Sequence, residues 1–148
     1  MNQMRKRMRR GLALLLAVLQ VMLVFAAVPV SAADDAATSG TCGENVTWTL
    51  SGGTLTISGT GAMTDYSLDN NAPWYGSRVN VKAVNIENGV TVIGTSAFSD
   101  CSNLADVTIP DSVVGISSAA FSGCSSLSSI VIPDSVGLIN AAAFMNCS

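Results

Sequence analysis

Two stretches late in the chain decide its fold, because one is a near copy of the other. Residues 97–113 read AFSDCSNLADVTIPDSV, and residues 120–136 read AFSGCSSLSSIVIPDSV. Phe98 and Phe121 stand 23 positions apart, and a third register begins with AFMNC at residues 143–147. A fixed period between about 20 and 29 residues, with apolar residues at constant phase, predicts a solenoid of stacked coils.

A more divergent copy precedes these two. One period before the apolar positions of residues 104–116, apolar residues occur again: Val81, Val84, Ile86, Val90 and Ile93. Tyr75 stands 23 positions before Phe98, so we predict that it fills the phenylalanine position of a degenerate first coil. The adjacent Trp74 is expected to plug the top of the core. The alternative is an exposed indole that stacks on carbohydrate.

Each unit contains one clear candidate strand and one shorter extended piece. Residues 107–109 and 130–132 alternate between the two faces of a strand, and the proline after each one ends it because proline lacks the next ladder donor. The pieces at 113–116 and 136–139 are predicted to form the opposite wall of each coil.

A single coil should not be stable alone. Its few inward apolar side chains contribute less free energy than the chain loses in conformational entropy on ordering. Neighbouring coils about 4.8 Å away must therefore supply ladder hydrogen bonds and cover the core. Equivalent residues should form columns, with Phe98, Phe121 and Phe144 one above another.

Residues 42–77 are predicted to form an N-terminal β-hairpin cap. Residues 46–50 and 54–58 alternate in hydrophobicity and are rich in β-branched side chains, while the Ser-Gly-Gly at 51–53 is a good reversal. Such a cover is needed because the first coil of a solenoid would otherwise expose a row of unpaired backbone groups.

The repeat pattern L-x-x-V-x-I-P-x-S-V-x-x-I, followed by A-F-x-x-C, resembles the BspA-like leucine-rich repeats of bacterial surface proteins. The resemblance covers about residues 79–148, and segments similar to residues 42–48 and 53–61 precede the repeats in relatives. It implies a mainly β leucine-rich-repeat solenoid in a secreted or wall-attached protein. Several members of that family are implicated in adhesion to host proteins or to other cells.

Residues 1–32 are predicted to be a secretory signal peptide: basic residues precede an apolar run, and small residues suit cleavage after Ala32. An uncleaved membrane anchor is the alternative. Residues 33–41 are predicted to be a disordered linker. Five of the seven basic residues precede residue 11, whereas all ten acidic residues lie at or beyond Asp34. The processed chain would carry 2 − 10 = −8 charges, which disfavours nucleic acid and anionic membranes as partners.

The repeats are assigned to residues 78–148, about three coils. The sequence stops at Cys147-Ser148, as the next unit begins. An uncovered last coil would expose an unpaired strand edge that is prone to association. We expect either that the sequence is a fragment of a longer protein or that a partner covers this edge.

The cysteines favour a structural role. Cys101, Cys124 and Cys147 share one phase of the repeat, which puts neighbouring α-carbons within bridging range but should leave their side chains parallel. We interpret them as small buried fillers. Disulfide pairing is left open, and Cys42 lies in the predicted cap. One column without histidine is a poor zinc site.

The sequence predicts no catalysis, cofactor or metal. Histidine is absent, which excludes Ser-His and Cys-His nucleophile pairs, and Lys82 is the only lysine beyond the leader. Asp111 and Asp134 stack in phase after the repeat prolines. We expect them to accept backbone hydrogen bonds in their turns rather than to bind calcium.

The outward strand positions remain as a candidate ligand-binding face. These positions are mostly small and uncharged: Ala83, Asn85, Asp106, Thr108, Ser129 and Val131. We predict a non-catalytic secreted or cell-surface module that binds a host matrix protein, a glycan or another surface protein, plausibly in adhesion. The alternatives are a structural spacer and the targeting repeats of a larger extracellular enzyme.

Overall fold

The computed structural model describes residues 38–147 of the 148-residue chain. The predicted signal peptide (1–32) and most of the predicted linker lie outside the described residues. The described part consists mainly of short strands, with one 3-10 helix, η1, at Tyr75–Asn80. No helix within it is both long and apolar enough to cross a membrane.

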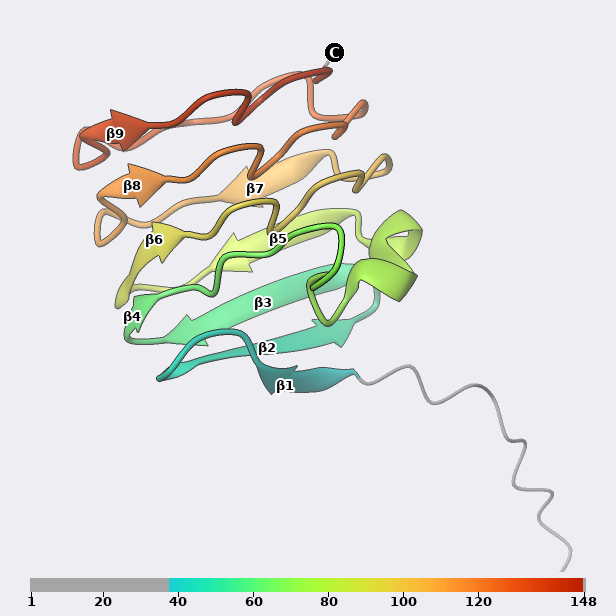
Figure 1. The fold of residues 1–148 in the computed structure, drawn as a ribbon, viewed down its shortest axis with the longest axis horizontal. Coiled ribbons are helices and arrows are strands. Elements are labelled where there is room, and N and C mark those ends of the chain that lie inside the picture. The colour runs from blue at the N-terminus through green and yellow to red at the C-terminus, as the bar shows by residue number, and fades with distance from the viewer. Residues whose placement is uncertain (1–37, 148) are drawn as a thin grey trace, which may run out of the picture. The chain divides into compact units, whose positions relative to one another are not determined.

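One sheet contains five strands in the order β1-β2-β3-β5-β7 (Figure 1). Its first three strands are antiparallel neighbours, whereas β3, β5 and β7 run parallel. The bounds of these strands are β1 Ser39–Thr41, β2 Val46–Ser51, β3 Thr54–Gly59, β5 Ala83–Ile86 and β7 Asp106–Thr108.

The other sheet contains four short strands in the order β4-β6-β8-β9, all of them parallel. Figure 1 shows them as a second row beside the first. The first two repeats contribute one strand to each row, the last contributes β9 alone, and successive repeats lie one above another. The bounds are β4 Gly61–Ala62, β6 Val90–Ile93, β8 Gly115–Ile116 and β9 Leu138–Ile139.

The β2–β3 turn follows from its two glycines. Gly52 and Gly53 both have positive φ (57° and 84°), a conformation that glycine adopts without steric cost, and the strands pair from Ser51↔Thr54 down to Val46↔Gly59. Because side chains alternate along a strand, this register turns Trp48 and Leu55 inward, where they are buried.

The hydrophobic core lies between the two rows of strands and runs through all repeats as one cluster. The predicted phenylalanine column is confirmed: the rings of Phe98 and Phe121 stack at 5.2 Å between centroids, and those of Phe121 and Phe144 at 5.4 Å. Phe98 and Phe121 are fully buried, while Phe144 is half-buried. The repeat period therefore places its largest apolar side chains on one axis.

The aromatic position of the first coil was predicted wrongly. Trp74, not Tyr75, stacks on Phe98, with 5.7 Å between ring centroids, and its indole N–H donates to the Ala97 carbonyl at 2.9 Å. Trp74 is only 2% exposed, which excludes the alternative of a surface indole that stacks on carbohydrate. Tyr75 instead begins η1 and is half-buried. The helix that starts at this point shifts the inward position by one residue from the 23-residue phase.

Three predicted segments also differ in extent. Ser39–Thr41, predicted as linker, form strand β1, because they pair with Thr47 to Thr49 of β2. Residues 130–132 are not a strand, although their sequence matches the region of β7, and the five-stranded sheet ends at β7. The predicted extended pieces at 113–116 and 136–139 shorten to the two-residue strands β8 and β9.

Two positions of every repeat have left-handed backbone. The first is occupied by Ser96, Ala119 and Ala142 and the second by Asp100, Gly123 and Asn146, all with φ between 53° and 75°. Aspartate, glycine and asparagine are the residues that tolerate this conformation best. Because the same torsions recur in all three copies, they belong to the path of the repeat and are not a special feature of one site.

Candidate functional site

The structure brings together four of the six residues predicted to form the ligand-binding face. Ala83 lies opposite Asp106, and Asn85 lies opposite Thr108, in the parallel register of β5 and β7. The side chains between them, such as Val84 and Val107, turn into the core, so that these four share the outer surface of the sheet.

The last two predicted residues are exposed but do not continue the sheet. Ser129 and Val131 lie in a segment without strand structure, and Val131 is 82% exposed. Their part of the predicted face is therefore a loop beside β7 rather than a further strand.

The same outer surface extends in the other direction, onto strands that were predicted as cap and linker. Thr54 and Thr56 of β3 lie opposite Ala83 and Asn85, and the register continues through β2 to β1. Hydroxyl side chains occupy every outward position here: Ser39, Thr41, Thr47, Thr49, Ser51, Thr54, Thr56 and Ser58. We call this surface, together with Ala83, Asn85, Asp106 and Thr108, the hydroxyl face.

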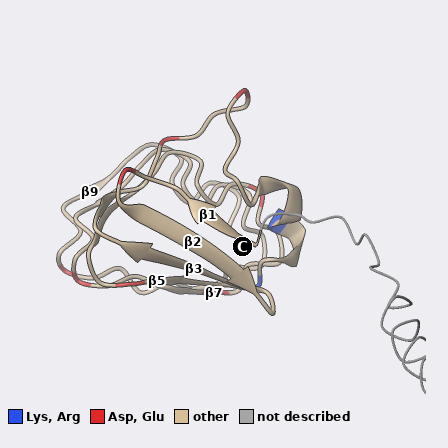
Figure 2. Ribbon diagram, turned by 90° about the horizontal axis from the view of Figure 1, so that it is seen from below, with Lys and Arg blue, Asp and Glu red and all other residues tan. Residues whose placement is uncertain are grey.

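The hydroxyl face carries little charge. Figure 2 shows that the ribbons of β1, β2, β3 and β5 contain neither acidic nor basic residues, whereas acidic positions gather in turns. Asp106 at the start of β7 is the one carboxylate among the residues of the face. Thr47 and Ser58 share a hydrogen bond between their hydroxyl oxygens at 3.3 Å. The surface therefore offers neutral hydrogen-bonding groups in rows about 4.8 Å apart.

The signal for this extension was present in the sequence. In V-T-W-T-L-S and T-L-T-I-S a threonine or serine occupies every second position, as the outer side of a strand requires. What the sequence did not reveal is that β3 pairs in parallel with β5, which joins the hairpin and the repeats into one sheet.

In the cysteine column, Cys101 and Cys124 are buried and Cys147 is half-buried, and two of the thiols donate hydrogen bonds besides filling space. The Cys124 thiol donates to the Phe98 carbonyl, and the Cys147 thiol to the Phe121 carbonyl, each at 3.2 Å. In the first coil the corresponding carbonyl, that of Tyr75, accepts from the Arg78 guanidinium at 2.8 Å instead. Cys124 and Cys147 thus each satisfy a carbonyl of the coil before them.

The thiols are poor nucleophiles. Burial raises the pKa of the Cys42 and Cys101 thiols from 9.0 to about 12 in each case, and it raises the pKa of Cys124 further. The thiolate is the reactive form, so these side chains resist alkylation and metal binding while the protein is folded. All four cysteines are free thiols in the structure.

The turn after each repeat proline is fixed by serine rather than by aspartate, contrary to the prediction. The Ser112 hydroxyl donates to the Val90 carbonyl at 2.8 Å and accepts from the Gly89 amide at 3.0 Å. Ser135 donates to the Val113 carbonyl at 2.8 Å in the same way. Asp111, next to Ser112, is exposed to solvent. The shorter serine side chain reaches the coil below, and the carboxylate points outward.

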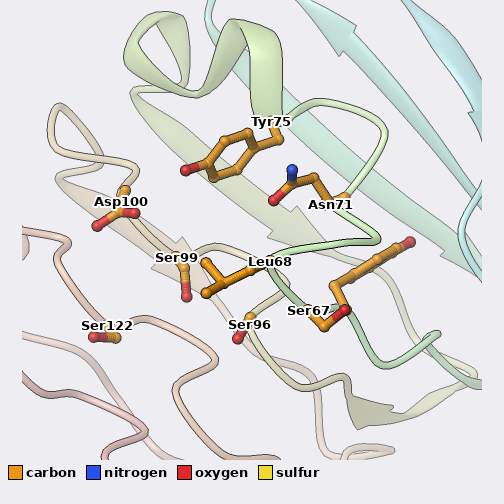
Figure 3. A pocket seen from close by; sticks show the side chains of 10 residues that line it. Ser67, Leu68, Asn71, Tyr75, Ser96, Ser99, Asp100 and Ser122 are labelled. Carbon is orange, nitrogen blue, oxygen red and sulfur yellow. The ribbon is translucent and has the colours of Figure 1, made fainter.

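A pocket of about 150 Å³ lies away from the hydroxyl face, where the loop at 64–74 meets the turns of two repeats (Figure 3). Asn71 and Tyr75 form one wall, and Ser99, Asp100 and Ser122 form the other. The remaining lining comes from Tyr66, Ser67, Leu68, Ala72 and Ser96. Sequence reasoning missed this pocket because nothing in the irregular loop predicts where it folds.

The loop that forms the pocket is attached at both of its ends. The Thr95 amide donates to the Asp65 carboxylate at 2.7 Å, and the Tyr66 amide donates to the Thr95 carbonyl at 2.9 Å. The hydrogen bond from Thr95 also lowers the pKa of Asp65. At the other end the indole of Trp74 is bonded to Ala97. The pocket is therefore preformed rather than assembled by a ligand.

Among residues 38–147 no three histidine, cysteine, aspartate or glutamate side chains are grouped in a way that could hold a metal ion. Lys82, the one lysine beyond the leader, is exposed beside the hairpin turn at Gly53.

The stacked parallel strands, the 23-residue period and the leucine, valine and isoleucine core define a leucine-rich repeat protein. The family model for the BspA type leucine rich repeat region, in six copies, matches residues 71–148. The chain belongs to this BspA-type leucine-rich repeat family.

A solved structure agrees with this assignment. A leucine-rich repeat protein from Eubacterium ventriosum is 36% identical, with a TM-score of 0.62, over 68% of this chain and 28% of that one. A leucine-rich repeat protein from T. pallidum is 26% identical over 68% of this chain and 64% of its own, with a TM-score of 0.37. The chain thus spans less than two thirds of either structure. Comparison with the curated proteins gives no match.

Proposed function

We propose that this protein is a secreted or cell-surface interaction module of the BspA type that binds a protein or glycan partner through the hydroxyl face. Its repeats form a solenoid, and the β2–β3 hairpin caps it. Proteins of this type are typically found at the bacterial surface or outside the cell, which supports that location together with the basic and apolar leader at residues 1–32.

The observation that carries the proposal is the continuity of the hydroxyl face over five paired strands. Threonine and serine hydroxyls both donate and accept hydrogen bonds, and here they are held in regular rows by the backbone ladder. A partner with repeated polar groups, such as a glycan chain or an extended peptide, would match such rows.

The size of the face limits the affinity of one copy. Its twelve outward residues, each occupying about 4.8 Å across the strands and about 6.8 Å along them, cover roughly 400 Å², against about 800 Å² per partner in a standard protein interface. The face also lacks tryptophan, tyrosine and arginine anchors. We therefore propose weak contacts that gain strength when several copies or further repeats act together.

The test is retention of extracellular-matrix proteins and of glycans by the immobilised protein, made from the full chain. Thr49→Arg places a long cation at the centre of the hydroxyl face, and the matched control Thr60→Arg places it on an exposed loop outside the face. We expect Thr49→Arg and Asp106→Lys to weaken retention at least roughly tenfold, and Thr60→Arg to leave it unchanged. Equal effects of the three variants would refute the role of this face.

A structural spacer is the second candidate. The unbroken aromatic stack from Trp74 to Phe144 supports it, because a rigid, regularly lengthened body is what holds another domain at a distance. If neither matrix proteins nor glycans are retained by the unaltered protein, the spacer function replaces the binding function. Targeting repeats of a larger extracellular enzyme would instead retain the substrate of that enzyme.

A further inference from the structure

We propose that the pocket between the loop at 64–74 and the repeat turns binds a single uncharged sugar ring. This goes beyond the hydroxyl face, from which the pocket is separate, and does not depend on it. The site would recognise one monosaccharide, or the terminal residue of a glycan, with the rest of the ligand in solvent.

The size of the pocket limits the ligand to one small ring. Its volume of about 150 Å³ is well below the roughly 300–1,000 Å³ of sites for drug-sized molecules. A disaccharide would not fit inside, whereas one face and two or three hydroxyl groups of a hexose would.

The lining has the hydrogen-bonding chemistry that a sugar needs. A hydroxyl group both donates and accepts, so its recognition requires both kinds of partner. The Asn71 amide supplies donors and an acceptor, the Asp100 carboxylate supplies acceptors, and the Tyr75 hydroxyl points toward the Asp100 wall (Figure 3). Ser99 donates its own proton to the Ala119 carbonyl at 2.8 Å, which leaves its oxygen as a fixed acceptor.

The aromatic residues supply surfaces for the C–H groups of the ring. Tyr66 is 8% exposed and packs edge-on against Trp74, with 6.0 Å between ring centroids. Tyr75 is held by the Arg78 guanidinium, which lies 4.0 Å from its ring centroid. Rigid aromatic walls beside a few placed polar groups are typical of small-molecule sites.

The charges around the pocket select against anions. Asp100 is the one ionised side chain in the lining. The nearby cation, Arg78, is engaged with both the carbonyl oxygen and the ring of Tyr75. Acidic sugars would therefore meet a carboxylate whose one neighbouring cation among residues 38–147 is already engaged, and the pocket should prefer neutral hexoses.

Asp100 belongs to the first clear repeat alone. The equivalent positions in the next copies are Gly123 and Asn146. Gly123 also makes room for this carboxylate, since an added β-carbon there would lie 2.5 Å from an Asp100 oxygen. The chain thus supplies its own conservative substitution: Asp100→Asn introduces the residue that the third copy already uses with the same left-handed torsion.

The test is titration of the ¹⁵N-labelled protein with glucose, galactose, mannose and N-acetylglucosamine. We expect saturable shifts of the amide signals of Asn71, Ser96, Ser99 and Asp100 with at least one of these sugars. Asp100→Asn should weaken binding roughly tenfold, as expected for loss of a charged acceptor. Asp111→Asn, an exposed turn residue outside the pocket, is the matched control and should bind as the unaltered protein does.

The alternatives give different results. Absence of saturable shifts with all four neutral sugars overturns the proposal, and so does tighter binding of glucuronic acid. If the pocket binds lysine amide more tightly than the sugars, its ligand is a cationic side chain instead, and this result also overturns the proposal. The Asp106→Lys variant of the hydroxyl face should leave sugar binding unchanged, so the pocket and the proposed function fail or succeed independently.

Discussion

The two ends of the strand stack differ, although both consist of short apolar and polar alternations. At the hairpin end (residues 39–59) the antiparallel strands cover the core, and Trp48, Leu55 and Ile57 are 1% exposed or less. At the open end (residues 128–147) Leu138 is 58% exposed and Ile139 is 48% exposed. The contrast shows that the inward apolar residues of a repeat become buried only where an adjacent coil or strand covers them.

The aromatic side chains show the same change from one end to the other. Near the hairpin end Trp48 meets Trp74 edge-on, with 69° between ring planes. From Trp74 onward the rings stack, and the angle falls to 2° between Phe121 and Phe144. Trp74 is thus the junction between irregular packing and the regular column.

The largest expected effect lies in the middle of the column. Phe121→Ala should lower the free energy of unfolding by about 3–5 kcal/mol, because the ring is fully buried between two others. Phe144→Ala, at the open end, should cost only about 1–2 kcal/mol, since its ring has one stacked neighbour among the described residues. Urea denaturation measures both values. Equal costs would mean that the open end is covered in solution.

A smaller difference should separate the two tryptophans. Trp74→Phe leaves the Ala97 carbonyl without its donor, which should cost about 1–3 kcal/mol. The Trp48 indole N–H is buried without a hydrogen-bond partner in the described part of the molecule, so Trp48→Phe removes an unsatisfied group and should cost less. The same denaturation assay compares them. A larger loss for Trp48→Phe would contradict the assigned hydrogen bonds.

Alkaline pH should destabilise the protein through its buried thiols. Their pKa is raised in the folded state, from 9.0 to about 12 for Cys42 and Cys101, so the unfolded chain loses protons first as pH rises. The stabilisation is complete below pH 9.0 and is lost between that value and the folded pKa. Tyr66, with its pKa raised to about 12, acts in the same direction.

The urea midpoint should therefore fall as pH rises above the ordinary thiol pKa, and the fall should be shallower in Cys124→Ala. Cys147→Ala is the control, because that thiol is only half-buried and its removal should change the slope less. A pH dependence that is the same in both variants would exclude the Cys124 thiol as a contributor to it.

The smallest effect on stability is expected at the open end. Leu138→Lys and Ile139→Lys should change the free energy of unfolding by less than about 0.5 kcal/mol, because both side chains are exposed. They should nevertheless reduce self-association in sedimentation experiments, since charged residues protect an exposed strand edge. Leu68→Lys, exposed on the loop beside the pocket, is the control and should leave association unchanged.

Much of the fold follows from the 23-residue period, because stacked units must repeat their inward positions. The period correctly predicts the column of Phe98, Phe121 and Phe144 and the inward direction of Val107. It fails at Tyr75, where η1 shifts the phase by one residue, and such a shift depends on the packing of Trp74. The 23-residue period predicts inward positions well where the copies are similar in sequence. It predicts them poorly in the divergent first repeat.

The candidate sites were less predictable than the fold. The outward residues of β5 and β7 were found from alternation, but β1 was missed because Ser39-Gly40-Thr41 resembles a flexible linker until a partner strand lies beside it. The residues at 130–132 match a strand in sequence, yet they form none, and the five-stranded sheet ends at β7. The pocket depends on a loop without periodicity, whose path is set by tertiary hydrogen bonds at Asp65 and Trp74.

The hydrogen bonds between coils have a consequence for how the chain grows. Phe98 donates its amide proton to the Ala120 carbonyl, and its own carbonyl accepts from the Cys124 thiol. Both hydrogen-bond partners of Phe98 therefore belong to the coil that follows it in the sequence. Phe121 stands in the same relation to Ala143 and Cys147. Each of these coils therefore leaves donors and acceptors that only the next coil satisfies. The stack therefore lengthens by the addition of coils at its C-terminal face.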